Sequence, residues 1–222
     1  PEVKEWKGLD GSIALSGRII YKGLEEKKVA QQLADDYQQL FGKQLTLVQD
    51  KARKGDIVLR LKAEKALGEE GYTMSIHDTP ILSANHRKGL YWATRTLLQL
   101  LEQHPSHALP RGEIRDTPDY PFRGVMLDCG RKYFPMSMLR QYVKMLAYYK
   151  MNVFHIHLND NAFQWFYNND WSRTPAAFRL ESEWFPGLTA RDGHYTKHDF
   201  IALQQLADSL GIEVIPEIDV PQ

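Results

Sequence analysis

Apolar residues in the first half of the chain recur with two different periods. The helical period covers residues 24–41 and about 86–103, and Gly42 follows the first of these segments as a stop signal. Shorter runs rich in aliphatic residues are typical of strands, and they cover residues 12–21, 44–48, 56–61, 71–77 and 80–84. The last two runs flank the turn residues His77-Asp-Thr-Pro80, which predict a hairpin. We therefore expect a small mixed α/β unit with two helices.

The pattern changes after residue 103. Turn-forming residues are frequent between residues 104 and 120, and we place a boundary there between a domain of residues 1–115 and a domain of residues 116–222. Strand-like runs then alternate with amphipathic helical segments, in the order 122–129, 138–150, 152–158, 197–210 and 212–218. This βαβαβ alternation predicts an α/β fold with parallel strands and right-handed crossovers.

Composition narrows the class of protein. The chain has 28 Lys and Arg against 28 Asp and Glu, and 43% of its residues are hydrophobic. This composition excludes a disordered chain and a polybasic tail, and it gives no charge excess for binding nucleic acid or an anionic membrane. The single cysteine, Cys129, excludes an internal disulfide and a cysteine-rich zinc site. No apolar run approaches the ~18 residues of a membrane span, and Pro1-Glu-Val-Lys does not begin a signal peptide.

Polar residues gather where each of the three predicted parallel strands ends. The first strand is followed by Arg131, the second carries His155 and His157 and leads to Asp160, and the third ends in Glu217 and Asp219. Ligand-binding and catalytic groups collect at the carboxyl ends of parallel strands, both in open α/β sheets and in (β/α)8 barrels. We therefore expect an active site at these strand ends.

Two other readings of the same residues stay open. Arg131 can form a structural salt bridge with Asp128 or Asp219 instead of contacting a ligand. His155 and His157 share one strand face, and with Asp160 they could bind a metal, or they could be a hydrogen-bonded core pair.

Three ordered motifs resemble the start of the catalytic barrel of glycoside hydrolase family 20, the β-N-acetylhexosaminidases. They are Phe122-Arg-Gly-Val-Met-Leu-Asp-Cys-Gly-Arg131, Met145-Leu-Ala-Tyr-Tyr-Lys-Met-Asn-Val-Phe-His155-Ile-His-Leu158 and Val214-Ile-Pro-Glu-Ile-Asp-Val-Pro221. Upstream, Leu67-Gly-Glu-Glu-Gly-Tyr72 and Gly89-Leu-Tyr-Trp-Ala-Thr-Arg-Thr-Leu-Leu-Gln-Leu-Leu101 are similar to that family's accessory α/β domain. The resemblance implies an accessory domain followed by the first three βα units of a TIM (β/α)8 barrel.

The resemblance also implies roles for individual residues. Arg131 matches the arginine that binds hydroxyls of the terminal sugar, and Asp219 matches an active-site carboxylate. Asp160 matches an aspartate in a network with a histidine and the catalytic acid, while Glu217 has a more structural expectation. We expect His157 to support the same active site. No metal and no cofactor is implied.

The sequence departs from the family's motifs at a few positions. Asn159, Asn161 and Ala162 stand where Thr, Asp and Gln are usual, and Gln222 replaces a glycine. A family member that releases a disaccharide unit, as a lacto-N-biosidase does, is therefore one possible specificity.

The family's reaction implies that the catalytic pair lies outside these 222 residues. In the family the 2-acetamido group of the substrate is the nucleophile, an aspartate orients it, and an adjacent glutamate protonates the leaving oxygen. The chain contains no adjacent Asp-Glu pair, and a complete barrel alone takes ~250 residues. We therefore expect an inactive amino-terminal fragment of a retaining glycosidase.

The expected partner is a glycan with a terminal N-acetylhexosamine, met in a periplasmic or extracellular location. The incomplete barrel also predicts self-association through its exposed edge. Two other function classes remain: a non-catalytic carbohydrate-binding module, using Arg131 and the aromatic residues between 161 and 196, and a metal-dependent barrel hydrolase using His155 and His157.

Overall fold

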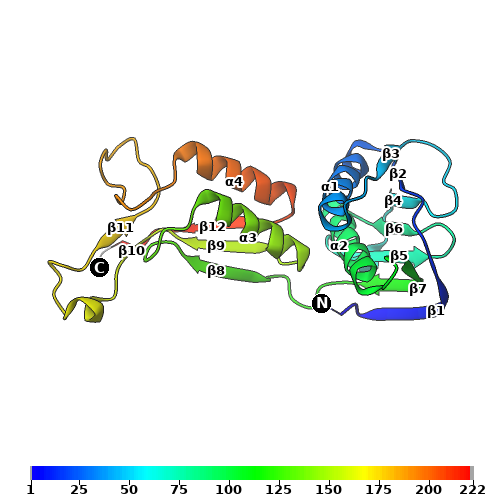
Figure 1. Cartoon of the computed structure of the whole chain (residues 1–222), viewed down its shortest axis with the longest axis horizontal. Helices are drawn as coiled ribbons and strands as arrows, with labels where there is room; N and C mark the ends of the chain where they lie inside the picture. Colours follow the sequence, from blue (N-terminus) through cyan, green and yellow to red (C-terminus); the bar gives the residue numbers. More distant parts are fainter. Residues whose placement is uncertain (1, 221–222) are drawn as a thin grey trace. The chain divides into compact units, whose positions relative to one another are not determined.

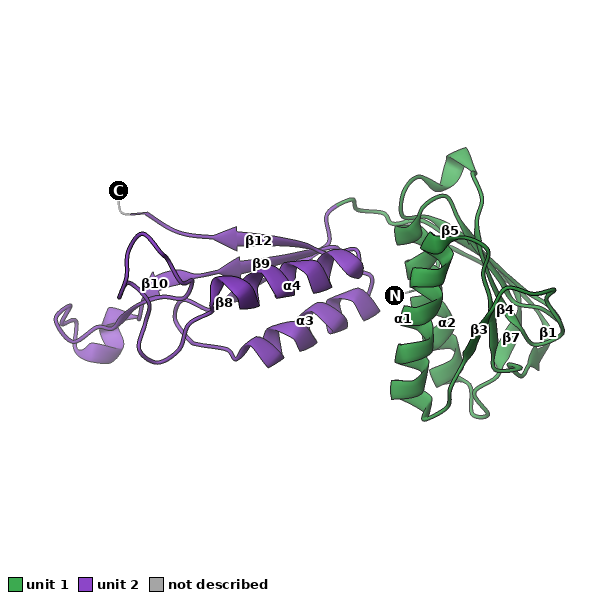
Figure 2. Cartoon of the chain, turned by 90° about the horizontal axis from the view of Figure 1, so that it is seen from above, with its two compact units in different colours: residues 1–121 green, residues 122–222 purple. Residues whose placement is uncertain are grey.

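A computed structural model of the chain describes residues 2–220 and divides the chain into two compact units, residues 1–121 and 122–222 (Figure 2). Each unit has its own sheet and its own pair of long helices. No helix among the described residues is both long enough and apolar enough to cross a membrane.

The first unit is built on a seven-stranded sheet with the order β1-β7-β5-β6-β4-β2-β3 (Figure 1). Its strands are β1 Glu5–Ile13, β2 Arg18–Ile20, β3 Thr46–Val48, β4 Ile57–Leu61, β5 Tyr72–Ile76, β6 Ile81–Ala84 and β7 Leu109–Asp116. Strands β5 and β6 pair antiparallel, which confirms the predicted hairpin, and β7 and β1 extend this antiparallel half. Strands β6, β4, β2 and β3 pair in parallel.

Helices α1 (Leu24–Phe41) and α2 (Arg87–Gln103) lie side by side on one face of this sheet (Figures 1 and 2). Gly42 ends α1 in the left-handed conformation, where a glycine is favoured. The core between helices and sheet contains fully buried large side chains such as Leu33, Met74 and Trp92. A short 3-10 helix, η1, covers Lys65–Leu67.

The single strand predicted over residues 12–21 is wrong. The chain leaves the sheet after Ile13 and re-enters it at Arg18, so two strands stand in its place. The reason is a turn at Gly17, where φ is +88°, a backbone conformation that glycine tolerates best. Strand β7, and β1 before Ser12, have no counterpart among the strands predicted from the sequence.

The second unit contains a three-stranded parallel sheet with the order β12-β9-β8. The strands are β8 Gly124–Asp128, β9 Val153–His157 and β12 Glu213–Glu217, and they agree with the predicted strands within two residues at each end. Helices α3 (Met136–Tyr148) and α4 (Lys197–Ser209) connect them and pack on the same face of the sheet (Figure 2).

The strand register aligns side chains on the face that the helices leave open. Asp128, His157 and Glu217 form one row across the three strands, and Met126, His155 and Ile215 form the row before it. Side chains alternate along each strand, so Phe154 and Ile156 of β9 point the other way, toward the helices, and are fully buried. One open face thus ends in a row of charged and ionisable groups.

The segment between β9 and α4 contains local structure of its own. Strand β10 (Asn159–Asn161) pairs antiparallel with β11 (Ala176–Phe178), and a short 3-10 helix, η2 (Gln164–Tyr167), lies between them. The hairpin follows β9 after one residue, so the residues just beyond the strand end have a fixed backbone.

Candidate active site

Arg131 lies three residues beyond β8 and is held by two carboxylates. Its Nη1 is 2.7 Å from Oδ2 of Asp128, and its Nη2 is 2.6 Å from Oδ2 of Asp160. The backbone N–H of Arg131 also donates to Oδ1 of Asp128 over 2.9 Å. The guanidinium plane is therefore fixed by groups from the ends of two neighbouring strands.

These contacts stabilise the charged forms of both partners. The Asp128 carboxylate raises the pKa of Arg131. Burial acts to raise the pKa of Asp128, but hydrogen bonds from the backbone and side chain of Arg131 outweigh it and hold that pKa below its ordinary value.

Arg131 with its two carboxylate partners, Asp128 and Asp160, is named here the arginine clamp. His157 connects this arginine clamp to the third strand. Its Nε2 lies 2.8 Å from Oδ2 of Asp160, and its Nδ1 lies 3.1 Å from Oε2 of Glu217, although the second contact lacks the angle of a hydrogen bond. Burial acts to lower the pKa of His157, but the hydrogen bond to Asp160 and the nearby carboxylates of Glu217 and Asp128 raise it overall. His155 Nε2 contacts the same Glu217 oxygen at 2.8 Å.

The same cluster contains the donor set that a metal would need. One ligand atom each from His157, Glu217 and Asp219 lies within 4.8 Å of the other two. A metal ligand must be a neutral imidazole with a free lone pair, whereas both nitrogens of His157 face carboxylates and its pKa is raised. The geometry therefore fits a hydrogen-bonded ion-pair network better than a metal centre.

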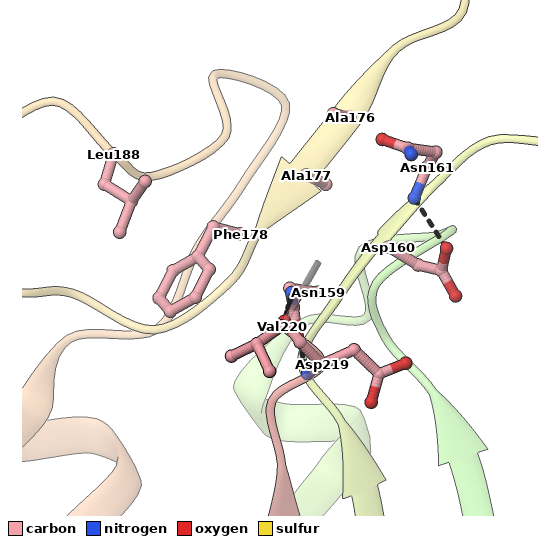
Figure 3. A pocket seen from close by; sticks show the side chains of 9 residues that line it. All are labelled: Asn159, Asp160, Asn161, Ala176, Ala177, Phe178, Leu188, Asp219 and Val220. Atoms are coloured by element: carbon pink, nitrogen blue, oxygen red, sulfur yellow. Dashed lines mark hydrogen bonds between the residues drawn. The ribbon is translucent and has the colours of Figure 1, made fainter. Parts of the chain in front are cut away.

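Asp219 is positioned through its backbone. The side-chain amide of Asn159 donates to the Asp219 carbonyl and accepts from the Asp219 N–H, both over 2.8 Å. Figure 3 shows the Asp160 and Asp219 carboxylates on the same side, turned away from the apolar side chains of Phe178 and Leu188. These residues, with Asn161, Ala176, Ala177 and Val220, line a cavity of about 420 Å³.

The structure thus links Arg131, Asp160, His157 and Glu217 through consecutive contacts. Asp219 adds its carboxylate beside His157 and Glu217. Asn159, one of the departures from the family motif, holds Asp219, while Gln222 lies outside the described residues. Arg131 does bridge to Asp128, as the alternative reading expected, but it uses a different nitrogen for Asp160.

Sequence reasoning missed Arg179, which supports the site from behind. Its side chain is only 1% exposed, and it donates to the carbonyls of Cys129, Gly130 and Gly193 and to the carboxylate of Asp192. It thereby ties the segment that carries Arg131 to the segment that follows β11. A lone arginine between Phe178 and Leu180 belongs to no periodicity or motif that would single it out.

A glycine is required beside this support. A Cβ at Gly130 would lie 2.8 Å from the carbonyl carbon of Asn159 and 2.8 Å from the amide nitrogen of Asp160. Real Cβ atoms do not come so near to backbone, so the close approach of the β8 and β9 ends depends on this residue.

Comparisons with known proteins identify the family of the chain. The pattern of "Glycosyl hydrolase family 20, domain 2" matches residues 1–117, and that of "Glycosyl hydrolase family 20, catalytic domain" matches residues 120–222. The β-hexosaminidase of Vibrio furnissii is 32% identical over 189 residues, which cover 75% of this chain and 28% of that protein.

Solved structures extend the similarity to nearly the whole chain. The β-N-acetylhexosaminidase from Streptomyces coelicolor has a TM-score of 0.81 and 27% identity, covering 99% of this chain and 45% of that one. A mutant Streptomyces plicatus β-hexosaminidase in complex with its product GlcNAc has a TM-score of 0.82 and 26% identity, with the same two coverages of 99% and 45%. The chain spans 28% of the length of its Vibrio furnissii relative. Because the two family patterns together cover nearly all of its residues, the chain belongs to glycoside hydrolase family 20.

Proposed function

We propose that the chain is part of a β-N-acetylhexosaminidase, which removes terminal β-linked N-acetylglucosamine or N-acetylgalactosamine from glycans. The observation that carries the proposal is the Arg131 guanidinium, held by Asp128 and Asp160 at the ends of two parallel strands. A planar fork of N–H donors fixed in this way suits the vicinal hydroxyls of a sugar ring. The product-bound relative from Streptomyces plicatus supports GlcNAc as the sugar.

The proposed reaction proceeds with retention, through an oxazolinium intermediate formed by the substrate's own acetamido group. Within this chain Arg131 would bind the sugar, and Asp160 with His157 would hold a proton network beside it. Asp219 would add a carboxylate to the same edge. The general acid and the acetamide-orienting aspartate would come from residues beyond this chain, so the 222 residues alone would not hydrolyse a glycoside.

Release of a disaccharide unit is a possible specificity, because Asn161 and Ala162 depart from the family motif. A periplasmic or extracellular location fits an enzyme that acts on polymeric glycans. Strands β8 and β12 are the edges of the three-stranded sheet, and we propose that the isolated chain self-associates through such an edge.

A pair of substrates tests the proposed reaction in the protein that carries this chain with a complete barrel. The substrates share one leaving group, and one has a 2-acetamido group where the other has a 2-hydroxyl. Substrate-assisted catalysis predicts turnover of the N-acetylglucosaminide only, with retained configuration of the released sugar. Comparable turnover of the plain glucoside would contradict the proposal.

A further inference from the structure

Three aromatic side chains of the second unit gather beside Arg131. Phe163, Trp165 and Phe166, named here the aromatic platform, belong to the turn between β10 and β11. Each is a large apolar group left in solvent, with 49%, 64% and 65% of its surface exposed. Exposed apolar clusters of this kind mark interaction sites or ligand-binding grooves.

The platform begins at the arginine clamp. The guanidinium carbon of Arg131 lies 4.7 Å from the centre of the Phe163 ring. Trp165 and Phe166 stack on each other at 3.7 Å, and their ring centres lie 6.1 and 6.4 Å from that of Phe163. The rings therefore continue outward from the group proposed to bind the terminal sugar.

Backbone hydrogen bonds hold the platform in place. Asp160 pairs with Ala177 in the β10–β11 hairpin, so the residue that contacts Arg131 also belongs to the base of the platform. Ala162 N–H donates to the Pro175 carbonyl over 2.8 Å, just beyond the paired strands. The side-chain amide of Gln164 donates to the Asn169 carbonyl over 2.8 Å and closes the turn.

The chemistry of the turn favours a neutral, hydroxyl-rich occupant. Residues 161–176 contain one acidic and one basic side chain, Asp170 and Arg173, so the turn offers no net charge to a phosphate backbone or an anionic membrane. The carboxylate of Asp170 is engaged by the N–H and hydroxyl of Ser172. Amide side chains lie between the aromatic rings of the turn in the sequence, at Gln164, Asn168 and Asn169, and Asn161 precedes the first ring. Flat rings with interspersed amides match the alternating apolar faces and hydroxyls of sugar rings.

We propose that the aromatic platform binds the sugar units that follow the terminal N-acetylhexosamine, and so gives the enzyme a preference for oligosaccharides over short glycosides. This inference rests on the function proposed above, because it needs the terminal sugar at Arg131. The stacked pair of Trp165 and Phe166 binds the sugar unit of the oligosaccharide that lies farther from the terminal sugar.

The test compares two ligands in the protein with a complete barrel. The first is a β-linked N-acetylglucosamine trisaccharide, assayed for kcat/KM, and the second is free N-acetylglucosamine, assayed as a competitive inhibitor. The double variant Trp165→Ala, Phe166→Ala is expected to lower kcat/KM for the trisaccharide by about tenfold, the effect of losing roughly 1.4 kcal/mol of binding. Its inhibition constant for the monosaccharide stays within about twofold, since Arg131 is untouched.

The variant Trp184→Ala is the matched control, because this side chain is 89% exposed and makes no ring contact with the platform among the described residues. Trp184→Ala is expected to change neither kcat/KM for the trisaccharide nor the inhibition constant of N-acetylglucosamine. An equal kcat/KM for the trisaccharide in the double variant and the unaltered protein would contradict the proposed role of the aromatic platform. An equally large loss of inhibition by N-acetylglucosamine in the double variant would contradict it too. Failure of the unaltered protein to hydrolyse the trisaccharide would instead count against the proposed function.

Discussion

Arg131 is the residue on which the proposed sugar site depends most. Its two terminal nitrogens contact carboxylates at or just beyond the ends of different strands, so the position of its guanidinium depends on both strands. The strand-end pattern in the sequence pointed to this residue. The sequence offered Asp128 as a partner of Arg131, but it could not specify Asp160 as the second partner, because that contact depends on how β8 and β9 align.

Replacing Arg131 by lysine keeps the charge but removes the planar fork. In the barrel-complete protein, Arg131→Lys is expected to lower kcat/KM for an N-acetylglucosaminide by about 10- to 100-fold, since a hydrogen bond to a charged group is worth about 1.5–3 kcal/mol. The exposed Arg173, in the same unit, gives the control Arg173→Lys, which should leave kcat/KM unchanged. Equal activity of both variants would remove Arg131 from the sugar site.

His157 makes the stability of the second unit depend on pH. Its pKa in the folded protein is raised by Asp160, Glu217 and Asp128 despite burial, so the folded state binds its proton more tightly than the unfolded state does. The resulting stabilisation is complete below the ordinary histidine pKa of about 6.5 and disappears as pH rises through the raised value.

Urea unfolding at a series of pH values measures this effect. The free energy of unfolding is expected to fall as pH rises above about 6.5, and His157→Gln should reduce that slope while keeping a hydrogen bond to Asp160. His198→Gln, at an exposed position of α4, should leave the slope as it was. A slope that is the same in all three proteins would show that the His157 network does not stabilise the fold.

At the scale of elements, local pattern predicted the parts that bury a regular face. Both long helices of the first unit match within one residue, and the three parallel strands of the second unit match within two. Strand β1 was missed because it is exposed along nearly its whole length and therefore has no hydrophobic period.

Strand β7 was missed for a different reason. It contains Pro110 and Gly112, which favour a turn when read in sequence. In the structure a Cβ at Gly112 would lie 2.6 Å from the Lys7 carbonyl and 2.7 Å from the Trp6 ring, so the glycine allows β1 to approach. Only the packed neighbour explains this residue.

Arg179 connects two segments that the sequence separates by about fifty residues, and its loss is expected to loosen both. Arg179→Leu should lower the free energy of unfolding by about 2–5 kcal/mol, because buried carbonyls left without a donor cost about 1–3 kcal/mol each. Urea unfolding measures the change, and Arg173→Leu is the exposed control from the same segment. Equal stability of the two variants would mean that water replaces the guanidinium at no cost.

At the scale of the molecule, the first unit is expected to fold without the second. Its sheet and two helices enclose their own core, with Leu33, Met74 and Trp92 fully buried. Residues 1–121 alone should therefore unfold in urea with a single cooperative transition, followed by the fluorescence of Trp92 in the variant Trp6→Phe. A gradual, non-cooperative change would contradict this.

The second unit contains the proposed sugar-binding residue Arg131 but no adjacent Asp-Glu pair, so the central question is whether the chain alone can hydrolyse a glycoside. The most direct measurement compares hydrolysis of one chromogenic N-acetylglucosaminide by three proteins: the 222-residue chain, the barrel-complete protein and its Arg131→Ala variant. The account predicts turnover by the barrel-complete protein, a large loss in the variant and none by the chain alone. Comparable turnover by the 222-residue chain, or full activity without Arg131, would contradict it.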